Sequence, residues 1–402
     1  MNKEDWEVKK LENCFEFIRN GANIKQDSFA KGFPITRIET LSNDVFNRDR
    51  LGYANIFETE KYKKYLLYDK DILMSHINSM KYLGRAVLYI KKSDEIIIHG
   101  MNLLNLRAIK SILRPEFACY YFGSRSFKSD IYKIAKKAVN QASFTISSLK
   151  SISIPIPPLP IQTQIVAELG ELNAILDKKR KQLEELDTLA QATFYDMFGD
   201  PVLNEKGWEV KKLKDIVKKI GSGSTPRGGN KSYKAEGISF IRSLNIHNGA
   251  FSDHRLAFID EKQARLLKNV IVEENDVLLN ITGASVARCC VVPIQIIPAR
   301  VNQHVSIIRL KPELANYFYV ERLFISKSYQ YLLLSQSKSI GATREALTKS
   351  SLQELVIPIP PLPLQHQFAE RIEAIEAQKE LINQSIKEVQ LLFDYTMDKY
   401  FN

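Results

Sequence analysis

The sequence predicts an α+β protein built as an internal tandem repeat. It predicts two mixed α/β domains joined by two long helices that pair with each other as a coiled coil. Three observations lead to this fold class. A proline-rich phrase occurs twice, a second phrase recurs at almost the same offset, and each proline-rich phrase precedes a heptad pattern. A chain of 402 residues, 45% of them hydrophobic, is long enough to bury two or more cores.

The two repeated phrases give the length of the repeat. IPIPPLPIQTQ occupies residues 154–164 and IPIPPLPLQHQ occupies residues 357–367, an offset of 203 positions. WEVKKL occupies residues 6–11 and recurs at 208–213, an offset of 202 positions. Both offsets are close to half of the chain, which indicates one unit written twice.

The repeat divides the chain into four segments. We expect the two mixed domains at residues 1–153 and 201–356. We expect a proline lead-in followed by a long helix at residues 154–200 and again at 357–402.

Short apolar runs separated by turns predict the strands of both domains. The strands expected in the second domain lie at 237–246, 276–283, 287–293 and 303–310, and a helix is expected at 317–336. Those expected in the first domain lie, in the same order, at 32–41, 71–78 and 84–90.

Each proline-rich phrase leads into a heptad pattern. Alternating steps of four and three from Ile165 and from Phe368 give ten positions per helix, eight of them apolar. A 3.5-residue repeat over about five heptads is typical of a coiled-coil seam, and about 38 residues make a helix of roughly 57 Å. Proline presets φ and lacks the N–H that the first helical turn leaves unpaired, so the phrase predicts a stiff, extended lead-in. The expected seam residues are Ile165, Leu169, Leu172, Leu176, Leu183, Leu186, Phe368, Ile372, Ile375, Ile382, Ile386 and Val389.

Two other interpretations of these segments stay open. Each helix could pack only on its own domain, although a narrow seam favours one long partner, and the other helix is the obvious one. The proline-rich phrase could also serve as a polyproline ligand for another protein.

The charge of +11 is unevenly distributed. Residues 1–153 contain 26 Lys and Arg against 17 Asp and Glu, and residues 201–356 contain 23 against 14. The helical segments are acidic, with 4 against 8 in residues 154–200 and 4 against 7 in residues 357–402. Two basic domains on acidic helices predict two nucleic-acid-binding domains and disfavour a basic amphipathic membrane helix. Ordinary solubility charge is the alternative.

Other protein classes find little support in the sequence. No apolar run approaches the roughly 20 residues that span a bilayer, and the N-terminus is charged, so we expect a cytoplasmic protein. The four cysteines show neither C-x-x-C pairs nor zinc-site spacing. No P-loop, G-x-G-x-x-G, adenine-methylation or nuclease motif occurs, so we expect neither catalytic residues nor metal ligands.

Polar and basic residues in the loops of both domains are the candidates for DNA contacts. Arg, Lys and backbone amides bind phosphates, whereas Arg and Asn side chains also read guanine and adenine edges. For any single residue a flexible turn, or a structural role for a histidine, is an open alternative. The candidates are Arg37, Arg48, His76, Asn78 and Arg85 in the first domain, and Ser224, Thr225, Arg227, Asn230, Lys231, Tyr233, Arg242, Ser243, Asn245, Arg300, Asn302, Gln303 and His304 in the second.

Two variable basic domains, each followed by a long helix introduced by IPIPPLPxQxQ, resemble the specificity subunit of type I restriction-modification systems. The resemblance covers essentially the whole chain. Besides the proline-rich phrase, its most specific elements are MFGDPVLNEKGWEVKKL (197–213), GSGSTPRGG (221–229), FIRSLNI (240–246) and NQHVSIIRL (302–310).

The resemblance implies a function and a set of partners. Each basic domain would be a target recognition domain for one part of a split, asymmetric sequence in double-stranded DNA. The two long helices would form an antiparallel coiled coil with pseudo-two-fold symmetry. This coiled coil would space the domains and dock two methyltransferase subunits. The chain itself would bind no cofactor, while the methyltransferases would use S-adenosylmethionine. Whether restriction and translocase subunits that use ATP and Mg²⁺ join the complex stays open. The location would be the cytoplasm of a bacterium or archaeon, with no membrane partner.

The sequence departs from the family pattern at one point. Related sequences often carry glutamate between the two glutamines after the prolines, whereas Thr163 and His366 stand there in this chain. The contacts with a methyltransferase are therefore left open by the resemblance, although the helices are not.

Three rival functions stay open at this stage. A stand-alone DNA-binding regulator that self-associates through its coiled coil would be complete without a methyltransferase. The recognition subunit of a related class of restriction enzyme would have other partners. An enzyme with an unrecognised active site would bind S-adenosylmethionine by itself.

Overall fold

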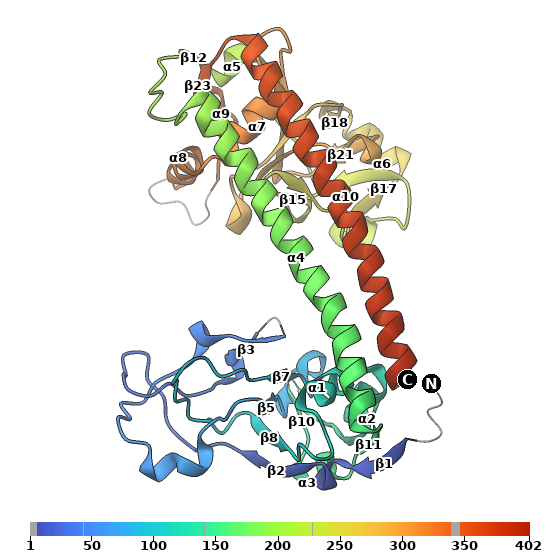
Figure 1. The fold of residues 1–402 in the computed structure, drawn as a ribbon. Coiled ribbons are helices and arrows are strands. Elements are labelled where there is room, and N and C mark those ends of the chain that lie inside the picture. The colour runs from blue at the N-terminus through green and yellow to red at the C-terminus, as the bar shows by residue number, and fades with distance from the viewer. Residues whose placement is uncertain (1–5, 43, 140, 227, 339–345) are drawn as a thin grey trace. The chain divides into compact units, whose positions relative to one another are not determined.

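The computed structural model describes residues 6–42, 44–139, 141–226, 228–338 and 346–402, and it divides into two compact units. Unit 1 comprises Met1–Arg180 and Gln384–Asn402, and unit 2 comprises Lys181–Asn383. Each unit therefore contains one mixed domain, the first half of the long helix that follows it, and the last half of the other long helix (Figure 1).

The two long helices, α4 (Leu159–Phe198) and α10 (Leu362–Phe401), are 40 residues each and are continuous. A proline occupies the second position of both, where its missing N–H costs no helical hydrogen bond. The start that the proline-rich phrase predicts is thus the start that the helices have.

The helices run antiparallel within each unit. In unit 2, Lys379 Nζ lies 2.8 Å from an Asp187 carboxylate oxygen. The ring of Phe368 lies 5.2 Å from that of Phe198. Residue numbers in α10 therefore fall as those in α4 rise. In unit 1, the Tyr400 hydroxyl donates to the Glu168 carboxylate, which fits the same direction.

Both domains are built around a four-stranded antiparallel sheet with the same strand order. In unit 1 the order is β2 (Phe15–Asn20), β8 (Leu104–Ala108), β5 (Ile72–Met74), β7 (Ala86–Leu88). In unit 2 it is β13 (Val217–Ser222), β22 (Val305–Leu310), β19 (Val277–Asn280), β20 (Cys289–Val291). The first strand has an irregular register at Phe15/Phe17 and, 202 positions later, at Val217/Lys219. The duplication therefore extends into the domains, where the sequence resemblance is weaker.

The remaining elements complete each unit. Those of unit 1 are β1 (Glu7–Lys10), β3 (Leu41–Ser42), β4 (Val45–Phe46), β6 (Ile77–Asn78), α1 (Pro115–Gly123), α2 (Arg125–Ile134), β9 (Lys136–Lys137), β10 (Ala142–Ser143), α3 (Ile146–Lys150) and β11 (Ser153–Ile156). Those of unit 2 are β12 (Glu209–Lys212), α5 (Leu213–Ile216), β14 (Ile238–Ile241), β15 (Ile246–His247), β16 (Ala250–Phe251), β17 (Ala257–Ile259), α6 (Glu261–Leu266), β18 (Ile271–Val272), β21 (Ala299–Val301), α7 (Tyr317–Ile325), α8 (Lys327–Ser337), α9 (Lys349–Gln353) and β23 (Val356–Ile359).

Four of the predicted elements are wrong in detail. The strands expected at 71–78 and 237–246 are each divided, into β5 and β6 and into β14 and β15. The helix expected at 317–336 is two helices, α7 and α8, because Ser326 is extended (ψ 146°) and its hydroxyl donates to the Leu323 carbonyl. The strand expected at 32–41 is instead three isolated bridges, made by Gly32 and Ile35, followed by a 3₁₀ turn at Ile38–Thr40. There the Arg37 amide donates to the Thr40 hydroxyl at 2.8 Å. Local side-chain hydrogen bonds replace regular structure at the last two places.

The two repeated sequence phrases pair with each other inside each unit. Strand β1, from the WEVKKL phrase, pairs antiparallel with β11, from the proline-rich phrase, and β12 pairs in the same way with β23. Pro155 and Pro358 are tolerated because each ribbon has only two strands. The lead-in is therefore extended, as predicted. Ile154 and Ile357 are fully buried, which disfavours the polyproline-ligand interpretation.

The first glutamine of each QxQ sequence is buried at the helix start and forms hydrogen bonds to backbone groups on both sides of it. The Gln162 side chain accepts from the Arg114 amide at 2.8 Å and donates to the Pro157 carbonyl at 2.9 Å. In unit 2, Gln365 accepts from the Asn316 amide at 2.8 Å and donates to the carbonyl of Pro360 at 2.8 Å. Both glutamines are fully buried. They tie the first turn of a long helix to the loop that precedes α1 or α7.

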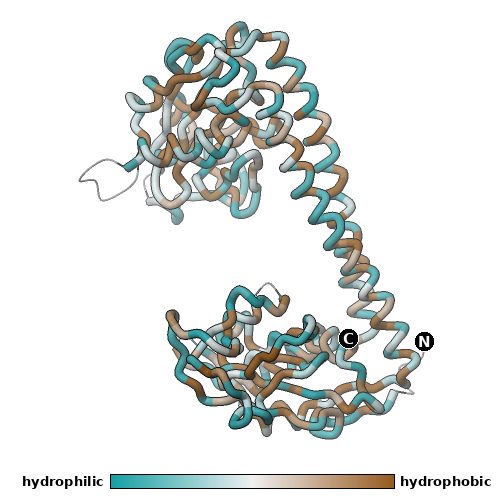
Figure 2. The backbone as a smooth tube through the Cα atoms, turned by 60° about the vertical axis from the view of Figure 1, so that its left-hand side comes forward, coloured by the Kyte–Doolittle hydropathy of each residue, from teal (hydrophilic) through white to brown (hydrophobic). Residues whose placement is uncertain are grey.

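All twelve predicted seam residues are buried or half-buried. Hydrophobic positions recur as brown bands along both helices in Figure 2. Phe194 and Phe198, which were not predicted, are also buried because they pack on Tyr319 of the unit 2 domain. The buried seam residues are Ile165, Leu169, Leu176, Phe368, Ile372 and Ile375. The half-buried ones are Leu172, Leu183, Leu186, Ile382, Ile386 and Val389.

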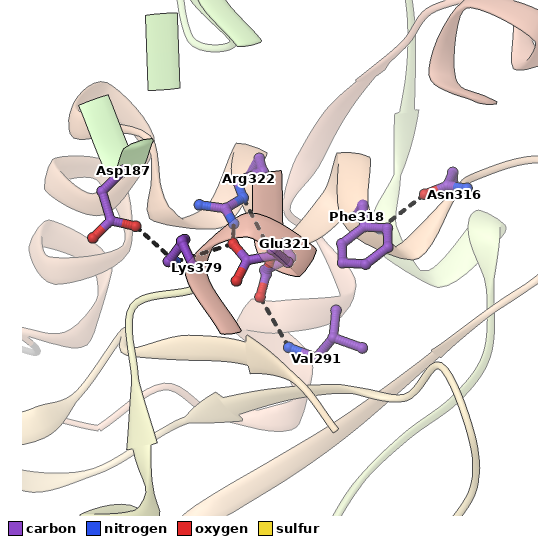
Figure 3. A network of polar contacts seen from close by, with 8 residues as sticks. Asp187, Val291, Asn316, Phe318, Glu321, Arg322 and Lys379 are labelled. Carbon is purple, nitrogen blue, oxygen red and sulfur yellow. Dashed lines mark hydrogen bonds and ion pairs between the residues drawn. The ribbon is translucent and has the colours of Figure 1, made fainter. Parts of the chain in front are cut away.

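A network of charges joins the domain of unit 2 to both helices (Figure 3). Arg322 of α7 donates to Glu376 of α10 at 2.8 Å, and Lys379 lies 3.1 Å from the same carboxylate. Lys379 also reaches Asp187 of α4. The side chains of Arg322 and Lys379 are only 7% and 13% exposed, so their positive charges depend on these carboxylates.

Glu321 stands beside this network. Its carboxylate accepts from the Val291 amide at 3.0 Å and lies 3.4 Å from Arg322. Burial raises the pKa of the Glu321 carboxyl, and the charge of Arg322 opposes that shift. The strand β20, the helix α7 and the long helix α10 are thereby connected by polar contacts.

Replacing Glu376 by Gln should lower the free energy of unfolding by about 2 kcal/mol, because the buried Arg322 loses the negative charge that compensates it. Chemical denaturation followed by circular dichroism would measure the difference. The control is Glu380→Gln on the exposed side of the same helix, for which we expect almost no change. Equal stability of the two variants would contradict a stabilising role for the network.

Candidate nucleic-acid interface

Three loops of unit 2 leave the same end of the central sheet. Strand β22 is antiparallel to both β13 and β19, so its beginning lies beside their ends. The loops after β13, after β19 and before β22 are therefore neighbours. They contain several residues that the sequence identifies as candidates for DNA contacts.

The side chains of these loops form a connected polar chain. The Thr225 hydroxyl donates to Gln303, whose amide nitrogen lies 3.1 Å from His304 Nε2. His304 Nδ1 shares a hydrogen bond with the Thr282 hydroxyl. Asn302 is buried and accepts the His304 amide at 3.0 Å, which fixes the turn. The result is an exposed amide beside a half-buried imidazole, and such groups can bond to base edges or phosphates.

A glycine allows this edge to form in both units. A Cβ on Gly223 would lie 1.8 Å from the Val301 carbonyl oxygen, and one on Gly21 would lie 2.2 Å from that of His99. The two glycines are 202 positions apart. Only glycine lets the chain pass so close to the neighbouring backbone as it leaves β2 or β13.

Other candidates of unit 2 are engaged within the fold. Asn245 is fully buried and donates to the Ser252 carbonyl at 2.8 Å, and Arg300 donates to the Ala299 carbonyl at 2.9 Å. Arg242 lies over the ring of Tyr233, 5.2 Å from its centroid. Arg227 lies outside the described residues. Ser243 is half-buried, whereas Ser224, Asn230 and Lys231 are exposed.

The corresponding end of the sheet in unit 1 carries three of the candidates. His76 and Asn78 follow β5, and Arg85 precedes β7. His76 is 8% exposed, and burial lowers its pKa, so the ring is neutral at neutral pH. Arg85 pairs with Asp44 at 2.9 Å. All three residues therefore lie at this end of the sheet, where Asn78 and Arg85 are half-buried and His76 is buried.

Arg48 and Arg37 are not part of that group. Arg48 forms two hydrogen bonds with Glu95, at 2.6 and 2.9 Å, and a third with the Ile90 carbonyl at 2.8 Å. Ile90 follows β7 at the opposite end of the strand from Arg85. Arg37 is exposed and lies 3.5 Å from Glu39. Three of the five N–H donors of Arg48 are thus used within the domain itself.

A repeated ion pair that the sequence analysis missed joins two strands of each sheet at the end opposite the candidate loops. Asp71 accepts two hydrogen bonds from Arg107, both at 2.8 Å, and joins the start of β5 to β8. Asp276 accepts from Arg309 at 2.8 and 2.9 Å between the equivalent strands of unit 2. The arginines are 202 positions apart and could have been found from the repeat, but the aspartates are 205 apart. The changed spacing concealed the pair.

Two basic domains with the same strand order, each followed by a long helix, define a protein of two duplicated domain–helix units. Residues 3–187 and 205–391 each match the family model of the type I restriction modification DNA specificity domain. The chain belongs to this family. It is a type I restriction-modification specificity subunit with two target recognition domains. None of the described helices is sufficiently long and apolar to cross a membrane.

Related proteins agree with this assignment. The chain is 33% identical over 389 residues to the specificity subunit of the type I restriction enzyme MjaX of Methanocaldococcus jannaschii, covering 93% of this chain and 87% of that one. It is 28% identical over 397 residues to the MjaIX specificity subunit of the same organism, covering 92% and 87%. The crystal structure of the S subunit of a type I restriction-modification system from M. genitalium has the same fold. Its TM-score is 0.56 at 15% identity, over 99% of this chain and 96% of that one.

Replacing Arg48 by Gln should destabilise unit 1 in a pH-dependent way. The Arg48 hydrogen bonds are the largest cause that lowers the pKa of Glu95 to about 2, against about 4.3 for an unfolded chain. Because the folded pKa is depressed, the pair stabilises the fold above pH of about 4, and this contribution is lost as pH falls toward 2.

Thermal unfolding of both proteins between pH 2 and 7 would test this. We expect a lower melting temperature for the variant at pH 7 and a difference that shrinks toward pH 2. A tenfold loss of DNA affinity with unchanged stability would instead make Arg48 a DNA contact.

Proposed function

We propose that this chain determines which DNA sequence a type I restriction-modification complex recognises. Each recognition domain reads one part of a split, asymmetric sequence in double-stranded DNA. The observation that carries the proposal is a shared sheet edge with different side chains. At the positions of Gln303 and His304, unit 1 has Met101 and Asn102, 202 positions earlier. All but His304 are exposed, and His304 is half-buried. Matched edges with different hydrogen-bonding groups favour two different half-sites.

The long helices supply the spacing in this proposal. A helix of 40 residues is about 60 Å long at 1.5 Å per residue. Symmetric DNA readers place their half-sites about 34 to 36 Å apart, one turn of the duplex. The helices are long enough for an unread spacer of that order between the two parts of the target.

The helices also present surface for partner subunits. Leu391, Leu392 and Tyr395 of α10 are 70%, 52% and 68% exposed, which is unusual for large apolar side chains on a regular helix. We propose that two methyltransferase subunits dock on the exposed sides of the helices. The methyltransferases flip an adenine and methylate it with S-adenosylmethionine, while this chain binds no cofactor and catalyses no step.

Further partners and the location complete the proposal. Restriction and translocase subunits that use ATP and Mg²⁺ join the same complex when DNA is to be cut. The complex works in the cytoplasm of a bacterium or archaeon. The family assignment favours neither a stand-alone regulator nor a related class of restriction enzyme.

Exchanging residues 221–350 for those of a different recognition domain should change one half of the modified sequence and leave the other half intact. The junctions fall in β13 and α9, which belong to the shared framework. Coexpression with the methyltransferase, followed by mapping of modified bases, gives the result directly. A change in both halves would argue against independent reading by the two domains.

Replacing Leu183 and Ile386 together by Asp should prevent assembly with the methyltransferases. Both side chains are half-buried on the long helices, and charges there would separate the seam at a cost of about 2 kcal/mol or more. Size-exclusion chromatography of the coexpressed subunits would measure assembly. Gln182→Asp with Lys387→Asp, on exposed neighbouring positions, is the matched control. Assembly by the Leu183 and Ile386 variant would refute the paired-helix docking surface.

A further inference from the structure

A short hairpin of unit 1 projects beside the sheet end described above. Strands β9 and β10 form the hairpin, and the Ala138 amide donates to the Gln141 carbonyl at 2.7 Å across its turn. Strand β10 lies between β9 and β6. Because β6 carries Asn78 and directly follows β5, the hairpin belongs to the same edge as the candidates His76 and Asn78.

The side chains of the hairpin are unusual for a turn whose only role is structural. Val139, in the turn, is 99% exposed, although turns favour Gly, Asn and Asp and strands bury valine. Lys136 and Lys137 are both exposed, and neither forms an ion pair with a described residue. An apolar tip on a basic two-stranded ribbon contributes little to the core of unit 1. It is therefore available to a partner.

In unit 2, the described residues on either side of the segment after α8 lie at the equivalent place. The Ala346 amide donates to the Ser337 carbonyl at 3.0 Å, and Ala346 forms a bridge with Thr282. Residues 339–345, which the two ends of this segment enclose, lie outside the described part of the chain. Thr282 bonds to His304 of the polar chain at the sheet edge. In both units the segment after the second domain helix thus returns beside the proposed reading edge.

We propose that the ribbon formed by β9 and β10 enters the major groove of the target DNA. Lys136 and Lys137 bind phosphates, and Val139 contacts a thymine methyl group. The major groove of B-DNA admits a two-stranded β-ribbon, and the thymine methyl is the one apolar feature among its base edges. The excess of base over acid in residues 1–153 favours DNA over a protein as the occupant. This inference rests on the proposed function, because it names a residue with which unit 1 reads its half-site.

The experiment uses the coexpressed complex with methyltransferase and a duplex that carries the modified sequence mapped for the wild type. Fluorescence anisotropy at several salt concentrations measures affinity. Lys136→Ala with Lys137→Ala should weaken binding to target and unrelated duplexes alike and reduce the slope of log affinity against log salt by about 2. The matched control is Lys91→Ala with Lys92→Ala, an exposed pair elsewhere in unit 1 that should change neither quantity.

Val139→Thr keeps the shape of the side chain but replaces one methyl group by a hydroxyl. It should lower affinity for the target about fivefold to tenfold and leave binding to unrelated duplex unchanged. Replacing thymine by uracil, one position at a time in the half-site of unit 1, should find one position where the wild type loses a similar factor. At that position the variant should lose nothing more, because the methyl contact is already absent.

The outcomes separate the two proposals. If the wild-type complex modifies no split sequence, the proposed function fails before the hairpin is tested. If it does, and the lysine and valine variants bind as the wild type does, the hairpin is not a DNA contact. Loss of methyltransferase from the purified complex in the lysine variant would show a protein contact instead and overturn the inference. Unchanged melting temperatures would show that the variants fold.

Discussion

The direction of the long helices depends on a few buried hydrogen bonds at their first turns. A tilt of about 10° at one end of a 60 Å helix displaces the other end by about 10 Å. Gln162 and Gln365 prevent such a tilt, because each satisfies buried backbone groups on both sides of a helix start. The ribbons β1–β11 and β12–β23 hold the preceding residues. The two repeated sequence segments therefore fix the direction in which each long helix leaves its own domain.

The two units use one framework with different interiors. Arg322 and Glu376 of unit 2 correspond to Tyr120 and Asn173 of unit 1, where the Asn173 amide donates to the Tyr120 hydroxyl at 3.3 Å. A neutral pair thus replaces a charged one. If the start of α4 stood in unit 2, the buried Arg322 would face an amide in place of a carboxylate. The unpaired charge would cost several kcal/mol, so each domain favours its own helix start.

Periodic features could be predicted from the sequence, and features that depend on a distant partner could not. The heptads of α4 and α10 follow from spacing alone, as does the repeat. The break at Ser326 and the turn after Arg37 depend on single side-chain hydrogen bonds that no periodicity reveals. Among the candidate DNA contacts, residue type identified Gln303 and His304 but also Arg48, whose partner Glu95 lies 47 residues away. Arginine suits a phosphate and a carboxylate equally well, and only the fold decides which one it meets.

Buried groups maintain the sheet, whereas exposed side chains can vary, and this explains how the two units share a framework but expose different residues at the candidate edge. Gly21 and Gly223 allow the close passage at the candidate edge, and the Asp71–Arg107 and Asp276–Arg309 pairs hold the same sheets at the opposite ends of the strands. The exposed side chains beyond those groups contribute little to stability, so they can change at small cost. Met101 can therefore stand where Gln303 stands in the other unit, without any change in the sheet beneath it. The buried Asp–Arg pairs lie at the opposite ends of these strands, so the residues that the fold requires are separated from those that a target sequence can select.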